Sequence, residues 1–193
     1  GRLLRAGLFS FSERTGPEYP KFRPMPELVK MGLDNPDNYY VSTGVNPRYR
    51  YRIRGNRRSI HYMSFAATNQ NFAAKDKITG GAGHLNDAEI KTDADGNFEI
   101  IASQTEEPGN WLRMAGDTKQ ILLRQTFLHK DREAPVDIEV ECIDHAGAPP
   151  PLDPTHIAGS LMGSAMYAIG CAQWFADWVR DFESKASVNT FHL

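Results

Sequence analysis

The chain has 193 residues, of which 40% are hydrophobic and 24% charged, and its formal net charge is −2 at pH 7. This length suits one domain with a sizeable core, and the composition is ordinary for a soluble globular protein. The near-neutral balance gives no electrostatic reason to expect a nucleic-acid partner.

The first 40 residues predict a helical segment followed by a proline-rich arm. Apolar residues at positions 3, 4, 8, 9 and 11 fall on one face of a short helix that ends before Gly16-Pro17. Prolines then space Tyr19 and Phe22, which is typical of an extended arm that lies across a neighbouring domain or subunit. Residues 26–32 predict a short helix, with proline in its first turn and glycine at its end.

Residues 41–148 predict a β domain. Period-two alternation of apolar and polar residues puts one face of a strand in a core and the other in water. The run 120–128 has apolar residues at both parities, so we expect it to be a central strand covered on both faces. An antiparallel sandwich of at least six strands is therefore expected, including strands at 48–54, 59–67, 97–103, 120–128 and 136–143.

The strand at 48–54 carries four arginines on its polar face. Arginine forks suit phosphate oxygens, but the slightly acidic chain favours ion pairs with a neighbouring strand instead. The expected pairing joins Arg48, Arg50, Arg52 and Arg54 with Asp137, Glu139 and Glu141.

Two glycine-containing connections invite a ligand interpretation. Residues 69–86 are long, polar and glycine-rich, and we interpret them as a mobile lid, although they match neither phosphate-binding glycine motif. Residues 93–97 resemble a calcium loop, yet Lys91 stands where an EF-hand has an acid. Asp-Gly between two strand-like runs predicts a hairpin turn, so no metal or cofactor is predicted.

After three prolines, residues 149–193 predict a linker and a long helix from Asp153 to about Phe182. Residues 157–176 lack charge, but Gly, Ser and Gln173 dilute the run, which favours a buried or interface helix over a membrane span. Cys142 and Cys171 fit neither a disulfide framework nor a C-x-x-C metal motif. We expect buried thiols and a cytoplasmic location.

Four motifs together carry a family resemblance. They are Asp34-Asn35-Pro36-Asp37-Asn38-Tyr39, Tyr51-Arg52-Ile53-Arg54-Gly55, Pro108-Gly109-Asn110-Trp111-Leu112 and Leu123-Arg124-Gln125-Thr126-Phe127-Leu128. From position 34 to 144 the chain resembles the N-terminal half of bacterial proteins related to the domain-of-unknown-function family twelve-fourteen. The resemblance implies a jelly-roll-like sandwich and a longer polypeptide with a second β region after the helix. It implies no catalytic residues.

The first functional hypothesis is a site for a small, partly apolar or aromatic molecule between the sheet and the glycine-rich loop. An enzyme of unknown reaction could follow from such a site. Arg124 interrupts the most apolar strand, and such a cation needs a carboxylate, a carbonyl, solvent or a ligand as partner. The expected ligand-binding residues are Trp111, Arg124, Tyr62 and Gln125. The acid or base candidates are His61, His84, Asp87 and Glu99, each of which more commonly has a structural role.

The alternative is an assembly module without catalytic activity. The proline arm and the uncharged helix would then bury against another copy of the chain or against a missing C-terminal half, because exposed apolar patches of that size commonly mark interfaces.

Overall fold

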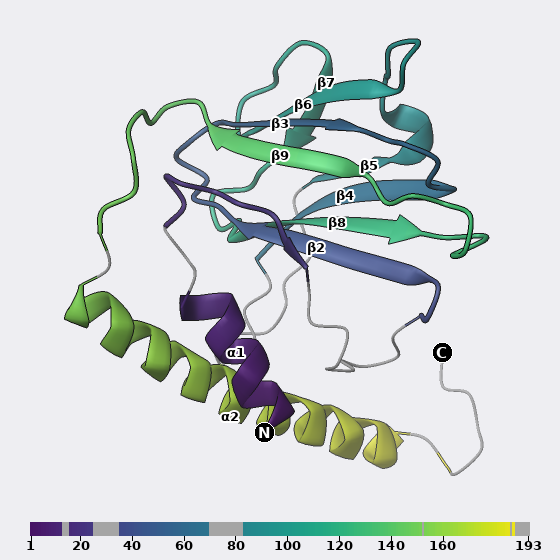
Figure 1. The fold of residues 1–193 in the computed structure, drawn as a ribbon. Coiled ribbons are helices and arrows are strands. Elements are labelled where there is room, and N and C mark those ends of the chain that lie inside the picture. The colour runs from purple at the N-terminus through teal and green to yellow at the C-terminus, as the bar shows by residue number, and fades with distance from the viewer. Residues whose placement is uncertain (13–15, 25–34, 70–82, 152, 186, 188–193) are drawn as a thin grey trace.

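The computed structural model describes residues 1–12, 16–24, 35–69, 83–151, 153–185 and 187. Two sheets pack face to face, and two α-helices lie together on one side of them (Figure 1). The helices are α1 (Arg2–Ser12) and α2 (Pro154–Lys185), with a 3₁₀ turn, η1, at Asp87–Glu89. The strands are β1 (Arg23–Pro24), β2 (Asn38–Gly44), β3 (Tyr51–Asn56), β4 (Tyr62–Thr68), β5 (Gly83–Asn86), β6 (Asn97–Ser103), β7 (Asn110–Arg113), β8 (Gln120–Thr126) and β9 (Asp137–Cys142).

The strand order confirms a mainly β fold with two layers. One sheet has the order β1-β2-β8-β4-β5 and the other β7-β6-β3-β9. The pairs are antiparallel except β6 with β7, which run parallel, so the expectation of a purely antiparallel sandwich was wrong at this edge. The run 120–128 supplies β8 at the centre of the five-stranded sheet, as predicted. A jelly-roll connection stays a prediction.

Several strand boundaries differ from the sequence prediction because turns shorten the strands. The strand expected at 48–54 begins at Tyr51, since the Tyr49 amide donates to the Asn46 carbonyl and closes a turn. Arg48 therefore lies outside the strand. The prediction for 97–103 is confirmed at both ends.

The predicted lid and hairpin also need correction. Gly83–Asn86 is strand β5, paired with β4, so the C-terminal end of the glycine-rich connection belongs to the sheet. Residues 70–82 lie outside the described residues. The turn at 93–97 is present, with Gly96 at φ +82°, but η1 precedes it where a strand was expected. It is therefore not a hairpin turn between two strands.

The core lies between the two sheets and consists of the inward side chains of both. Ile53, Phe65, Ile100 and Leu123 are fully buried there, and Phe65 meets Phe98 edge to face at 5.9 Å. Burying each such side chain contributes about 1.5–3 kcal/mol, which makes this layer the main source of stability.

The two helices form a pair through small residues. A Cβ added at Gly7 would lie 2.9 Å from the Cα of Ser164, so glycine permits the close approach of α1 to α2 (Figure 1). The predicted N-terminal and C-terminal helices are confirmed. No helix in the described residues has the length and apolar character that crossing a membrane requires.

The proline arm lies on its own chain rather than across another one. Its β1 segment pairs with β2, and the Tyr19 hydroxyl lies 2.9 Å from His145 Nε2. The Tyr49 hydroxyl donates to Glu18 at 3.2 Å. Of the two neighbours that the sequence predicted, a domain or a subunit, these residues of the arm contact the chain's own β domain. The short helix expected at 26–32 lies outside the described residues.

Candidate functional site

The candidate site is the outer face of the five-stranded sheet, on the side where the helices lie (Figure 1). Ile121, Leu123 and Gln125 of β8 are buried in the sandwich, so strand alternation directs Arg124 and its same-parity neighbours outward. We call this surface the Arg124 face. Its described residues are Arg23 of β1, Asn38, Tyr40 and Ser42 of β2, Leu122, Arg124 and Thr126 of β8, Tyr62, Ser64 and Ala66 of β4, and His84 and Asn86 of β5.

Strand register places Arg124 in the middle of this face. Tyr40 is its partner on β2 and Ser64 its partner on β4, and Asn86 of β5 is opposite Ser64. Neighbouring strands are about 4.8 Å apart, so these four residues form one row across the sheet. Ser42, Leu122 and Ala66 form the next row.

Arg124 has no compensating charge on this face. It is half-buried, and none of the face's described residues is an aspartate or glutamate. Within the described ranges no hydrogen bond or ion pair reaches its guanidinium group. A partly desolvated cation without a partner is unfavourable, and an anion that bound there would remove that cost.

The polar side chains around Arg124 are held by neighbours. Tyr62 Oη donates to Asn86 Oδ1 at 2.8 Å, and Asn38 Nδ2 donates to Tyr40 Oη at 2.8 Å. Thr126 Oγ1 in turn donates to Asn38 Oδ1 at 2.8 Å. These bonds fix both tyrosine side chains at the sides of the face.

A carboxylate does stand beyond the rim of the face, on η1. Glu89 accepts hydrogen bonds from the Asn86 backbone amide at 2.7 Å and from its side chain at 3.0 Å. The hydrogen bond from the Asn86 backbone amide lowers the pKa of Glu89. The Glu89 carboxylate is therefore ionised and hydrogen-bonded to Asn86.

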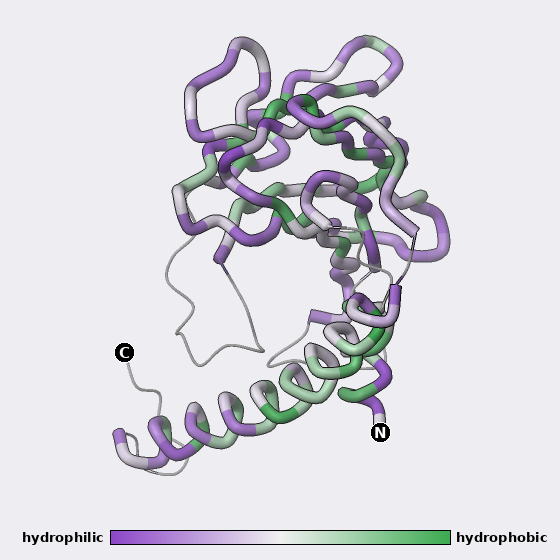
Figure 2. Tube along the Cα trace, turned by 90° about the vertical axis from the view of Figure 1, so that its left-hand side faces the viewer, coloured by the Kyte–Doolittle hydropathy of each residue, from purple (hydrophilic) through white to green (hydrophobic). Residues whose placement is uncertain are grey.

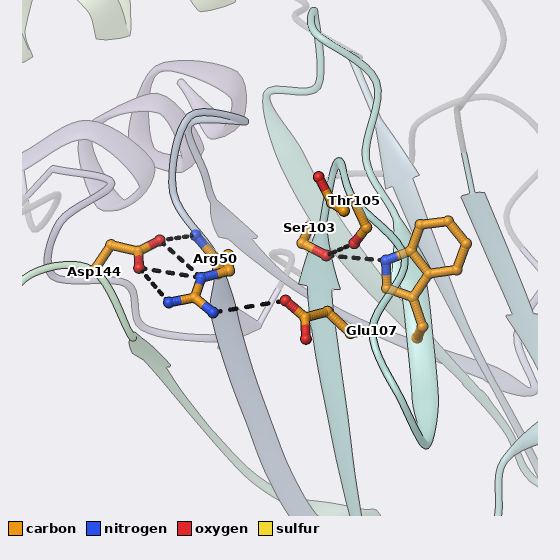
Figure 3. Close-up of polar contacts among 6 residues, drawn as sticks. Arg50, Ser103, Thr105, Glu107 and Asp144 are labelled. Atoms are coloured by element: carbon orange, nitrogen blue, oxygen red, sulfur yellow. Dashed lines mark hydrogen bonds and ion pairs between the residues drawn. The ribbon is translucent and has the colours of Figure 1, made fainter.

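The outer face of the four-stranded sheet provides the contrast, because three of its arginines are paired. Arg50 lies 2.8 Å from a carboxylate oxygen of Asp144 and 3.6 Å from one of Glu107. Figure 3 shows its guanidinium group between these two carboxylates. Arg52 meets Glu141 at 2.7 Å and Arg54 meets Glu99 at 2.9 Å. These three arginines thus face acidic side chains as predicted, but of the predicted partners only Glu141 forms ion pairs with them among the described residues, and Asp144, Glu107 and Glu99 supply the others.

Two of the four predicted ligand-binding residues lie elsewhere. Trp111 is on the other sheet, where its Nε1 donates to Ser103 Oγ at 3.0 Å and Ser103 donates onward to the Thr105 carbonyl (Figure 3). Gln125 is 1% exposed and its Oε1 accepts the Val136 amide at 2.6 Å inside the core. Arg124 and Tyr62 share the Arg124 face.

The four predicted acid or base residues are dispersed. His61 is exposed beside Glu133, Asp87 pairs with Arg57 at 3.2 Å, and Glu99 pairs with Arg54. Only His84 belongs to the Arg124 face, on the edge strand β5. Among the described residues no group of three His, Cys, Asp or Glu side chains is placed to hold a metal ion.

Sequence reasoning missed Tyr40, Ser64 and Asn86. Each is a polar residue at the correct parity within its strand, but only the strand register brings it beside Arg124 or Ser64. The period-two pattern was the available signal, and it does not identify which strands are neighbours.

No family model and no curated protein matches the chain. Among solved structures it is similar to an uncharacterized protein from Burkholderia cenocepacia, with 35% identity and a TM-score of 0.85 over 95% of this chain and 51% of that one. The chain thus spans about half the length of that relative. The VPA0106 protein from Vibrio parahaemolyticus matches 64% of this chain and 31% of its own at 17% identity and a TM-score of 0.35, too low to bear on the fold. The relation to family twelve-fourteen stays a prediction.

Proposed function

We propose that the chain binds a small, partly apolar or aromatic molecule on the Arg124 face. The observation that carries the proposal is the half-buried Arg124, which lacks an ion-pair partner within the described residues. Arg50, Arg52 and Arg54 on the other sheet each have a carboxylate within 3 Å, and Arg113 of β7 is exposed to solvent, so Arg124 differs from these arginines in being half-buried and unpaired among the described residues.

The surroundings of Arg124 support a ligand with an apolar body. Ser42 and Ala66 are small and flank Leu122 in the row beside Arg124, so they leave space above the sheet. Tyr40 and Tyr62 stand at the sides and offer aromatic surface. A mostly apolar surface with a few placed polar groups is typical of small-molecule sites.

The proposal is for binding rather than for a reaction. General acid–base catalysis needs a titratable group within hydrogen-bond reach of the reacting atom, usually with a second group that orients it. His84 is the one predicted acid or base on this face, and no described partner orients its ring. Tyr40, Tyr62 and Arg124 therefore account for ligand binding at this site without a catalytic role.

The binding proposal is tested by placing a large side chain on the Arg124 face. Replacing Ala66 with tryptophan is expected to weaken binding of 2-naphthoate and of neutral 2-naphthamide at least tenfold, because the indole occupies the space above Leu122. Amide chemical-shift titration measures both affinities and shows where each probe lies, with shifts expected in β2, β4 and β8. The matched control is Ile101→Trp on the outer face of the other sheet. Shifts confined to other regions, or unchanged affinity in Ala66→Trp, would contradict the proposal.

A second candidate function, assembly with another copy, is favoured by the exposed side of α2. Ser160, Ser164 and Cys171 are buried on the side next to α1. Figure 2 shows hydrophobic residues along much of α2 before its hydrophilic C-terminal end. Between residues 157 and 176 of α2, the large apolar side chains exposed by 44–65% are Ile157, Leu161, Met162, Met166 and Ile169.

In this proposal the exposed strip of one copy packs against the same strip of another about a two-fold axis. Residues 157–176 carry no charge, so two identical strips meet without repulsion in either direction. Covering several hundred Å² of apolar surface at about 25 cal/mol per Å² contributes several kcal/mol to association. The methionines adapt to an irregular partner surface.

Introducing a charge on this strip is expected to weaken self-association. Met162→Glu should raise the dimer dissociation constant at least tenfold in sedimentation velocity, because a carboxylate buried against apolar side chains lacks a partner. Arg180→Glu, at an exposed position near the end of α2, is the control and should leave association unchanged. A native chain that sediments as a monomer across the micromolar range would refute this second function.

A further inference from the structure

We infer that the ligand of the Arg124 face is an organic monoanion, specifically a carboxylate joined to an apolar or aromatic body. The inference rests on the proposed function, because it names the chemical class that the proposed site takes. Three features of the face support it: its charge, its free hydrogen-bond donors and the layout of its two rows.

The charge of the central row favours a single negative charge there. Arg124 is the one permanently ionised side chain of the row that it forms with Tyr40, Ser64 and Asn86, and this row contains no aspartate or glutamate. The second positive charge of the face, Arg23 of β1, lies opposite Ser42 in the neighbouring row. A ligand group with one negative charge therefore balances the central row, whereas a phosphate monoester carries nearly two negative charges at pH 7.

The hydrogen-bond donors of the central row favour an acceptor-only group. Tyr40 Oη already accepts from Asn38 Nδ2, so its own hydrogen is the group left to donate, and no described residue receives it. Ser64 lies opposite Arg124 on the other side, where it is buried beneath the face and its hydroxyl meets no hydrogen-bond partner among the described residues. Donors on both sides of a guanidinium suit an ionised carboxylate, which only accepts hydrogen bonds.

The geometry of arginine favours a planar carboxylate. A guanidinium group presents two parallel N–H donors, and a carboxylate meets them with its two oxygens. Each oxygen retains a lone pair, which Tyr40 Oη and Ser64 Oγ can satisfy from either side of the row. The anionic group thus lies over the row of Tyr40, Arg124 and Ser64.

The position of the apolar body follows from the adjacent row. Leu122 lies between Ser42 and Ala66, and these small neighbours leave the leucine side chain available for contact. The other neighbouring row, with Asn38, Thr126 and Tyr62, is occupied by its own hydrogen bonds. The body of the ligand therefore extends from Arg124 over Leu122.

The deciding comparison uses two probes of nearly equal shape. 2-Naphthoate should bind the full chain at least tenfold more tightly than 2-naphthamide, because the amide lacks the charge and carries N–H groups against the donors of the face. In Arg124→Gln this preference should fall to less than twofold, whereas Arg54→Gln on the other sheet should retain it. Tyr40→Phe should weaken naphthoate about threefold and leave naphthamide unchanged.

The outcomes separate the inference from the proposed function. If naphthamide binds the face as tightly as naphthoate, or if the preference survives in Arg124→Gln, the face binds small molecules but the carboxylate assignment is wrong. Tighter binding of 2-naphthyl phosphate than of 2-naphthoate would also overturn the assignment. If no probe shifts the amides of β2, β4 and β8, the proposed function itself fails. Unchanged thermal midpoints would verify that each variant is folded.

Discussion

Replacing Phe65 with alanine is expected to lower the free energy of unfolding by about 3–5 kcal/mol. Phe65 is fully buried in β4, and its ring meets Phe98 of the opposite sheet edge to face at 5.9 Å. Removing the ring loses its transfer free energy and the aromatic contact, and it leaves a cavity between the two sheets. The loss is a large share of the roughly 5–15 kcal/mol by which domains are stable.

Urea denaturation followed by tryptophan fluorescence and far-ultraviolet circular dichroism measures this loss. Leu128→Ala is the control, because Leu128 is a large apolar residue of the same β domain that is 62% exposed. We expect the control to change stability by no more than about 0.5 kcal/mol. A loss below about 1 kcal/mol in Phe65→Ala would mean that the two sheets do not pack through this ring.

The layers of the fold were predictable because local patterns encode them. The sequence pattern predicted five of the strands, and apolar residues at both parities marked one of them, β8, as central. The edges were less predictable, since Gly83–Asn86 looks like the end of a loop until β4 supplies its pairing partners. The parallel pairing of β7 with β6 depends likewise on contacts between strands, which a propensity pattern does not contain.

The candidate site was predictable only in part, and the pair Arg124 and Gln125 shows why. Both were expected to bind a ligand, but adjacent residues in a strand point to opposite faces. Gln125 shares its parity with Ile121 and Leu123, so alternation alone would have assigned it to the core. Tyr40 and Ser64 belong to strands far from β8 in sequence, and their place beside Arg124 follows from register alone.

The pairing of α1 with α2 was beyond the reach of the sequence for a related reason. The 3.6-residue period identified both helices, but the contact between Gly7 and Ser164 joins opposite ends of the chain. The uncharged run 157–176 of α2 predicts an apolar neighbour, but it does not specify which side of the helix that neighbour covers. The small residues next to α1 are covered, while the larger apolar residues of the other side remain exposed.

Replacing Gly55 with valine is expected to destabilise the chain by about 3 kcal/mol, because this glycine is required by space rather than by backbone conformation. Gly55 lies in β3 between Phe98 of β6 and Ile138 of β9. A Cβ at this position would collide with the carbonyl oxygen of Asp137 and lie 2.7 Å from the Phe98 ring. Phe98 packs against Phe65, so its ring cannot move aside without disturbing the core.

Gly159→Ala is the matched control, and the opposite sign is expected. Gly159 lies inside α2 with no other atom within 4 Å of an added Cβ, so alanine gains helix propensity without a clash. That substitution should stabilise the helix by about 0.8–1 kcal/mol. Urea denaturation of both variants measures the two effects separately. If Gly55→Val is as stable as the native chain, β3 does not run between Phe98 and Asp137 as described, and the pairing of β3 with β6 and β9 would need revision.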